Sequence, residues 1–168
     1  MKKEGDVMKK IIRRTTTLVM MICTFLISST VNAAENTNDF QEVSREKIEI
    51  KASSENSINV YSEPSLSECD LGIGISKNGI GVAYTTTATT IATEIGCKDI
   101  VLQEKTILGW KDIPIRDHYD YDTDIYTGSV VYLKAEVGKT YRVYCTHYAI
   151  IDEVEYTLYN ITDSIVYN

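Results

Sequence analysis

Residues 129–148, SVVYLKAEVGKTYRVYCTHY, decide the fold of this chain because their side chains alternate in type along an extended backbone. A period of two with β-branched and aromatic residues is typical of strands in a half-buried sheet. Gly138 lies where the chain must reverse, and glycine readily takes the positive φ that such turns need. The stretch therefore predicts a β-hairpin with arms over residues 126–137 and 139–148. The inward face of the second arm is expected to carry Tyr141, Val143, Cys145 and His147.

Other stretches of the chain show the same alternation. Strands are expected near residues 69–75, 80–87, 95–105 and 154–161, and the segment 76–79, SKNG, should join the first two as a tight hairpin. Pro114 indicates an edge position, because proline cannot donate a ladder hydrogen bond. About seven strands without helical periodicity predict an all-β fold, an antiparallel β-sandwich of the immunoglobulin-like type, with a small β-barrel as the alternative.

The start of the chain predicts export from the cell. Basic residues at 9, 10, 13 and 14 precede an apolar run over residues 18–27, and small residues end the segment at Ala33-Ala34. This order is typical of a secretory signal peptide, and the run is shorter than the about twenty residues that a transmembrane helix needs. We therefore expect residues 1–34 to be removed and the protein to be secreted. Residues 35–67 are polar and are expected to form a partly disordered leader to a domain over residues 68–168.

The charge of the chain limits its partners. The formal net charge is −7, and it becomes −11 once the first 34 residues, with six basic and two acidic residues, are removed. An acidic domain does not attract nucleic acid or anionic membranes through its long-range field. We therefore expect an extracellular or cell-surface ligand, with no nucleic-acid partner and no membrane partner for the mature form. No sequence motif indicates a cofactor.

The cysteines of the mature chain are Cys69, Cys97 and Cys145. Outside the cell an oxidised pair is expected, and the odd number leaves one thiol over. A sandwich topology brings all three toward one end of the domain, so each pairing stays open; Cys97–Cys145 is favoured because it would join two core strands. With His147, the same convergence makes a Cys₃His set of zinc-ligand types, although the close Cys-x₂-Cys spacing of most zinc sites is absent.

Aspartates crowd residues 117–124, which are expected to form a loop. Oxygen ligands at alternate positions are typical of calcium loops, so the candidate ligands are Asp117, Asp120, Asp122 and Asp124. An EF-hand is excluded, because the positions that need glycine and glutamate hold Ile125 and Val131. The alternative interpretation is a solvated acidic loop.

Three tyrosines form a candidate binding surface: Tyr132, Tyr144 and Tyr148 fall on the expected solvent side of the hairpin. Tyrosine offers contact area and a hydroxyl at small entropic cost, and cross-strand stabilisation of the sheet is the alternative role. We therefore expect a non-enzymatic binding or interaction module. A small secreted hydrolase that uses the acidic loop 117–124 with His118 is the alternative. No catalytic residue is assigned, since Cys145 and His147, two apart on a strand, should lie about 7 Å from each other.

Three groups of residues together resemble a family of small secreted proteins of Gram-positive bacteria whose domain has no assigned function. They are the threonine-rich strand that ends in Thr93-Glu94-Ile95, the segment 100–103 (IVLQ) with Gly109-Trp110 downstream, and the segment 137–143 (VGKTYRV) followed by His147. The resemblance covers residues 69–165. It implies secretion and a β-sandwich, and it carries over no catalytic residues.

Overall fold

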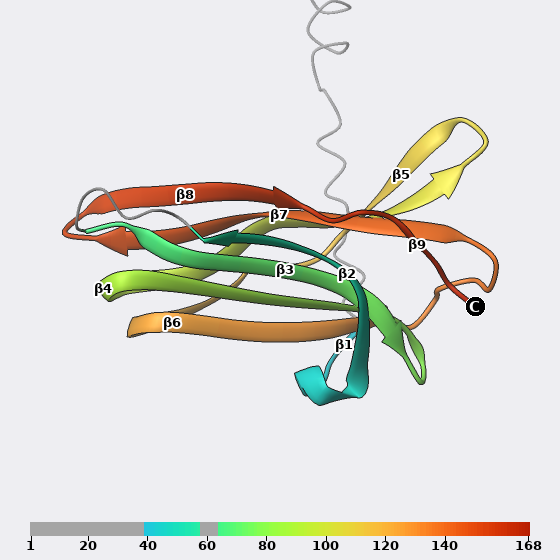
Figure 1. Ribbon diagram of the computed structural model, residues 1–168, viewed down its shortest axis with the longest axis horizontal. Helices are drawn as coiled ribbons and strands as arrows, with labels where there is room; N and C mark the ends of the chain where they lie inside the picture. The colour runs from blue at the N-terminus through green and yellow to red at the C-terminus, as the bar shows by residue number, and fades with distance from the viewer. Residues whose placement is uncertain (1–38, 58–63) are drawn as a thin grey trace, which may run out of the picture. The chain divides into compact units, whose positions relative to one another are not determined.

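Residues 39–57 and 64–168 are described by the computed structural model of this chain, and they form a nine-stranded antiparallel sheet (Figure 1). The segment expected to be a signal peptide lies outside the described residues. The predicted all-β, antiparallel, sandwich-like fold is confirmed. The elements in chain order are β1 Phe40–Glu42, the short 3₁₀ helix η1 Arg45–Lys47, β2 Ile48–Ser57, β3 Leu66–Ser76, β4 Gly79–Thr106, β5 Gly109–Pro114, β6 His118–Tyr132, β7 Thr140–Ile151, β8 Val154–Ile161 and β9 Ile165–Val166.

Strand β4 is 28 residues long and belongs to both layers of the fold. Its first part pairs with β3 and β6, and its later part pairs with β7 and β5. One layer therefore runs β2-β3-β4-β6-β1, and the other runs β8-β7-β4-β5. The strand bends between them at two register shifts, one between Thr87 and Ala92 and one between Lys98 and Val101. Asp99, inside the second shift, has a φ of +51°.

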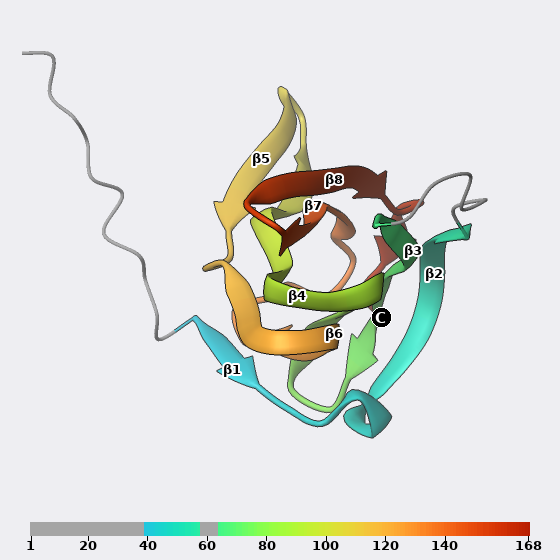
Figure 2. The same cartoon turned by 90° about the vertical axis from the view of Figure 1, so that its left-hand side faces the viewer.

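The predicted hairpin over residues 126–148 is wrong, because β6 and β7 do not pair with each other. Glu94, Ile95 and Cys97 of β4 pair with both strands at once, so β6 and β7 lie along its opposite edges. Figure 2 shows β4 between β7 and β6. Gly138 does have a positive φ of +85°, and Lys139 N donates to Glu136 O at 3.2 Å, but this turn lies within the connection from β6 to β7. The alternation of side-chain types predicts that a segment is a strand, but it does not show which other strand it pairs with.

The sheet begins earlier in the chain than the sequence predicts. The segment expected to be a partly disordered leader over residues 35–67 contains β1 and β2, which pair with β6 and β3. The short β1 is not evident in the sequence, because it lies at an edge of its layer and two of its three residues are polar and exposed. At Gly74 a Cβ atom would come within 2.2 Å of the Glu49 carbonyl oxygen, so glycine allows β2 to approach β3 there.

The predicted inward face of β7 is confirmed, because Tyr141, Val143, Cys145 and His147 are all 0 % exposed. The tight connection from β3 to β4 is also confirmed, with Ser76 paired to Gly79 across it. The alternation of Ile80, Val82, Tyr84 and Thr86 places a second row of side chains in the same interior. The two rows, from β4 and β7, meet at a set of buried polar side chains that includes Thr86 and His147.

Candidate functional site

A buried polar group lies between β4 and β7, and it consists of Thr86, Cys97, Cys145, His147 and Asn160. Cys97 of β4 is directly opposite His147 of β7, and Cys145 of β7 is directly opposite Asn160 of β8. The period of two places Cys145 and His147 on the same inward side of β7. The strand pairing therefore brings together side chains that are far apart in the sequence.

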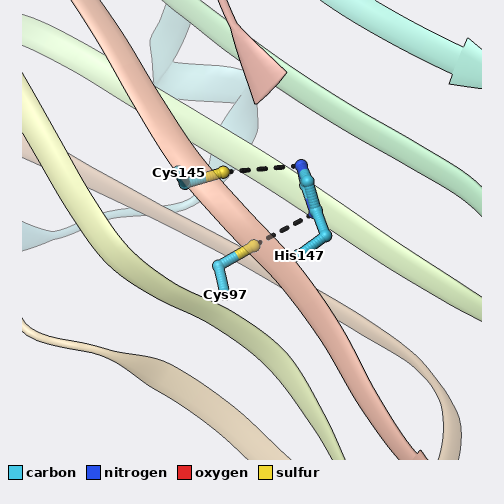
Figure 3. A group of neighbouring side chains, drawn as sticks. All are labelled: Cys97, Cys145 and His147. Carbon is cyan, nitrogen blue, oxygen red and sulfur yellow. Dashed lines mark hydrogen bonds between the residues drawn. The ribbon is translucent and has the colours of Figure 1, made fainter. Parts of the chain in front are cut away.

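Both ring nitrogens of His147 contact a thiol (Figure 3). Cys97 Sγ lies 3.2 Å from Nδ1, and Cys145 Sγ lies 3.5 Å from Nε2. The prediction that Cys145 and His147 are too far apart to interact is therefore wrong. Their Cα atoms are spaced as expected for a strand, but two side chains on the same face can lean together, and the relevant distance is the one between Sγ and the ring nitrogen.

The hydrogen bonds of Thr86 determine which nitrogen of His147 carries the proton. Thr86 Oγ1 donates to Gly96 O at 3.0 Å, so an N–H at Nδ1 of His147, 2.7 Å away, satisfies the remaining lone pairs of the hydroxyl; the same Nδ1 lies 3.2 Å from Cys97 Sγ and can share its proton with that sulfur. Nδ1 is therefore protonated in the neutral ring, and Nε2 presents a lone pair. Cys145 Sγ and the amide Nδ2 of Asn160, at 3.4 Å, lie beside that lone pair. The Asn160 amide also donates to the carbonyl of Cys69 at 3.1 Å.

The two thiols of this group differ strongly in acidity. Burial opposes ionisation of Cys97, but hydrogen bonds from Cys145 and His147 outweigh it and lower its pKa from 9.0 to about 6. The hydrogen bond to Cys97, together with burial, raises the pKa of Cys145. Burial raises the pKa of Cys69 to about 12. Of the two neighbouring thiols, ionisation is therefore favoured at Cys97 and opposed at Cys145.

All three cysteines are free thiols in the structure. The favoured pair, Cys97 and Cys145, does lie together, but no disulfide joins them, and Cys69, opposite Thr86 on β3, does not belong to the group of potential ligand atoms within 4.8 Å of one another. Cys97, Cys145 and His147 are each 0 % exposed. A substrate cannot reach these groups without separating strands, so their chemistry is that of an internal ligand or hydrogen-bonding set.

The predicted acidic loop is wrong in its backbone structure, because residues 118–124 belong to strand β6. The four candidate calcium ligands Asp117, Asp120, Asp122 and Asp124 are exposed. The carboxylate of Asp117 accepts from Asp99 N at 2.9 Å, and that of Asp120 accepts from Tyr121 N at 2.8 Å. Calcium binding by these residues stays a prediction. His118 turns inward, where its ring lies 5.5 Å from that of Tyr84 and burial lowers its pKa.

The predicted tyrosine surface is wrong for two of its three members. Tyr132 is buried because β1 adds to the edge of β6 and places the ring of Phe40 5.1 Å from its own. Tyr148 is buried and its hydroxyl donates to Glu94 at 2.5 Å. Tyr144 is half-buried, with the ring of Tyr159 at 5.8 Å. These residues stabilise the sheet across strands, which is the alternative considered above.

An exposed apolar tip was not anticipated from the sequence. Ile107 and Leu108 form the turn between β4 and β5, and their exposed fractions are 105 % and 100 %, the largest among the bulky apolar side chains of the described residues. Figure 1 shows the β4–β5 hairpin projecting from the sheet. Behind the tip, the ring of Trp110 lies under the cations of Lys105 at 4.8 Å and Arg142 at 4.2 Å. We call Ile107 and Leu108 the hairpin tip.

No family model matches this chain, and no curated protein is significantly similar to it. The resemblance to small secreted Gram-positive proteins therefore stays a prediction. Among the residues that the structure describes, no helix has the length and apolar character needed to cross a membrane.

Proposed function

We propose that this protein is a secreted, non-enzymatic extracellular module that binds a cell-surface ligand through the hairpin tip. The observation that carries the proposal is the full exposure of Ile107 and Leu108 at the end of a projecting hairpin. Two adjacent aliphatic side chains at a turn contribute nothing to the core, and polar residues would serve a solvated turn better. Their exposure supports a role in contact with another molecule.

The energy available from the tip suits such a role. Burying Ile107 and Leu108 against a ligand would contribute about 1.5–3 kcal/mol each. Trp110 and its two cations lie directly behind them and offer the aromatic and basic side chains that are enriched in the energetically important parts of interfaces. The hairpin therefore combines an apolar end with a polar rim, although the chain as a whole is acidic.

The positions of the reactive side chains also support a non-enzymatic role. Cys97, Cys145 and His147 lie inside the sandwich, where a substrate in solvent does not contact them. The hydrolase alternative needs His118 and the nearby aspartates to meet in one cleft. His118 faces Tyr84 in the interior, whereas Asp120, Asp122 and Asp124 are exposed along β6.

The test is binding of the mature protein to washed cells of the organism that produces it. Replacing both tip residues, Ile107→Ser with Leu108→Ser, should weaken cell binding at least about tenfold, as expected when the central side chains of an interface are lost. Ile91→Ser is the matched control, because Ile91 is also exposed, at 67 %, but lies on β4 away from the tip. Unchanged binding by the double variant, or an equal loss in Ile91→Ser, would contradict the proposal.

A further inference from the structure

We propose that Cys97, Cys145 and His147 form a zinc-binding centre inside the sandwich. This inference is independent of the hairpin tip and of any surface ligand. Among the described residues, these three are the one group of cysteine, histidine or acidic side chains whose potential ligand atoms all lie within 4.8 Å of one another. Two of them come from β7 and one from β4, so the register of two strands holds the group together.

The chemistry of the three donors selects zinc. Thiolate sulfur and imidazole nitrogen are zinc ligands, whereas calcium and magnesium take oxygen ligands. With three protein donors, the fourth position of a tetrahedral ion would be filled by a water molecule that enters with it. The fold also isolates the group from water, since all three side chains are 0 % exposed. A metal bound here would keep the two thiols from oxidation in an extracellular setting, where unprotected neighbouring thiols form disulfides.

The distances already resemble those between neighbouring ligands of one metal ion. Zinc lies about 2.3 Å from sulfur and about 2.0–2.1 Å from nitrogen, so neighbouring ligands of a tetrahedral site are roughly 3.5 Å apart. Cys145 Sγ is 3.5 Å from Nε2 of His147, whereas Cys97 Sγ lies 3.2 Å from Nδ1, on the other side of the ring. One potential ligand atom of each residue lies within 4.8 Å of the other two. Rotation of the Cys97 side chain is the adjustment that brings the third donor to the metal.

Thr86 supplies the outer hydrogen bond that a ligating histidine normally has. Zinc-bound histidines almost always donate their other ring N–H to an acceptor, which sets the tautomer and the ring orientation. Nδ1 of His147 donates to Thr86 Oγ1 at 2.7 Å, and Thr86 in turn donates to Gly96 O. These hydrogen bonds direct the Nε2 lone pair toward Cys145 and the Asn160 amide, which lies 3.4 Å from Nε2 and would have to turn away for a metal to take the lone pair.

Binding is balanced by proton release. Zn²⁺ would take the lone pair of Nε2 and two thiolates, so each thiol that carries a proton gives it up to solvent. No oxidant or reductant takes part. Zinc binding should therefore weaken as the pH falls, because protons compete for both sulfurs.

The first experiment measures zinc in the full mature chain after reduction and anaerobic loading with zinc. Metal analysis and native mass spectrometry should find about one zinc per chain, and nearly none in Cys97→Ser, Cys145→Ser or His147→Ala. Val143→Thr is the matched control: Val143 is equally buried on the same face of β7, and the change introduces a hydroxyl without touching a ligand. Absence of zinc from the wild-type protein, or equal loss in Val143→Thr, would overturn the proposal.

A second measurement does not depend on variants that could fail to fold. Cobalt loaded into the wild-type protein should give thiolate-to-metal absorption bands and the visible bands of tetrahedral coordination, and added zinc should remove them. Cobalt spectra with neither set of bands would show that the thiols do not coordinate the ion. That outcome would also overturn the proposal.

Discussion

Thr86 holds the imidazole of His147 in one tautomer. Its hydroxyl oxygen lies 2.7 Å from Nδ1 while its proton is given to the carbonyl of Gly96 at 3.0 Å. Both side chains are fully buried, so neither can exchange its partner for water. Thr86 belongs to the threonine-rich run 85–93, whose composition is typical of a solvated strand face. It is nevertheless buried, and it orients His147 beside the two thiols.

Loss of that hydroxyl should destabilise the fold. Thr86→Val keeps the shape of the side chain but removes the nearer acceptor of the Nδ1–H of His147 and leaves it only Cys97 Sγ at 3.2 Å, which should cost about 1–3 kcal/mol of unfolding free energy. Chemical denaturation monitored by circular dichroism measures this change. Thr86→Ser keeps the hydroxyl and should cost clearly less, so equal destabilisation by both substitutions would refute the role of the hydrogen bond.

The pKa of Cys97 predicts how stability changes with pH. Its pKa in the folded protein is about 6, below the ordinary value of 9.0, so the folded state binds the proton less tightly than the unfolded state. The resulting stabilisation is complete above the ordinary value and is lost as the pH falls from about 9 toward 6. Denaturation midpoints of wild type and Cys97→Ser, compared across this range, should converge at low pH. Parallel curves would contradict the lowered pKa of Cys97.

The single tryptophan should report the hairpin. Trp110 lies under Arg142, whose Nε also donates to Gln103 Oε1 at 2.7 Å. Arg142→Ala should expose one face of the indole, shift its fluorescence to longer wavelength and cost about 0.5–1 kcal/mol for the lost cation–π contact. Lys77→Ala removes an exposed lysine from the β3–β4 turn and should leave the spectrum unchanged. A spectrum equal to wild type in Arg142→Ala would show that the stacking is absent in solution.

Gly74 should tolerate no side chain. A Cβ atom there would lie 2.2 Å from the carbonyl oxygen of Glu49, and the backbone of β2 would have to move away. Gly74→Ala should therefore destabilise the protein by roughly 1–3 kcal/mol, as for other overpacked sites. Gly72→Ala is the control, because its Cβ would meet only the end of the Ile50 side chain at 3.0 Å. Thermal unfolding of the two variants measures the difference, and equal midpoints would contradict close packing of β2 on β3.

The strands could be predicted from the sequence, but their partners could not. The alternation around Val143 correctly identifies a strand with one buried face, because burial of one side is what produces the period of two. The same pattern is equally compatible with pairing to β6 or to β4. The observed pairing depends on β4, which lies between β6 and β7, and no feature of residues 129–148 indicates that β4 separates these two strands.

The candidate site was predictable only in part. The shared inward face of Cys145 and His147 follows from their spacing, and the structure confirms it. The contribution of Thr86 could not be found, since no local feature separates buried Thr86 from exposed Thr90 in the same run. Tyr132 was predicted to be exposed but is buried, because β1 covers it. The segment that contains β1 is polar, and its composition is typical of a mobile leader.

The continuity of β4 has a mechanical consequence. A ligand held at Ile107 and Leu108 would pull along a strand whose backbone runs without a break to Cys97 and on to Gly79. Neighbouring strands flank β4 along its length, so such a load would shear many backbone hydrogen bonds at once instead of peeling them one after another. A load applied at the hairpin tip would therefore be distributed over the strands that pair with β4.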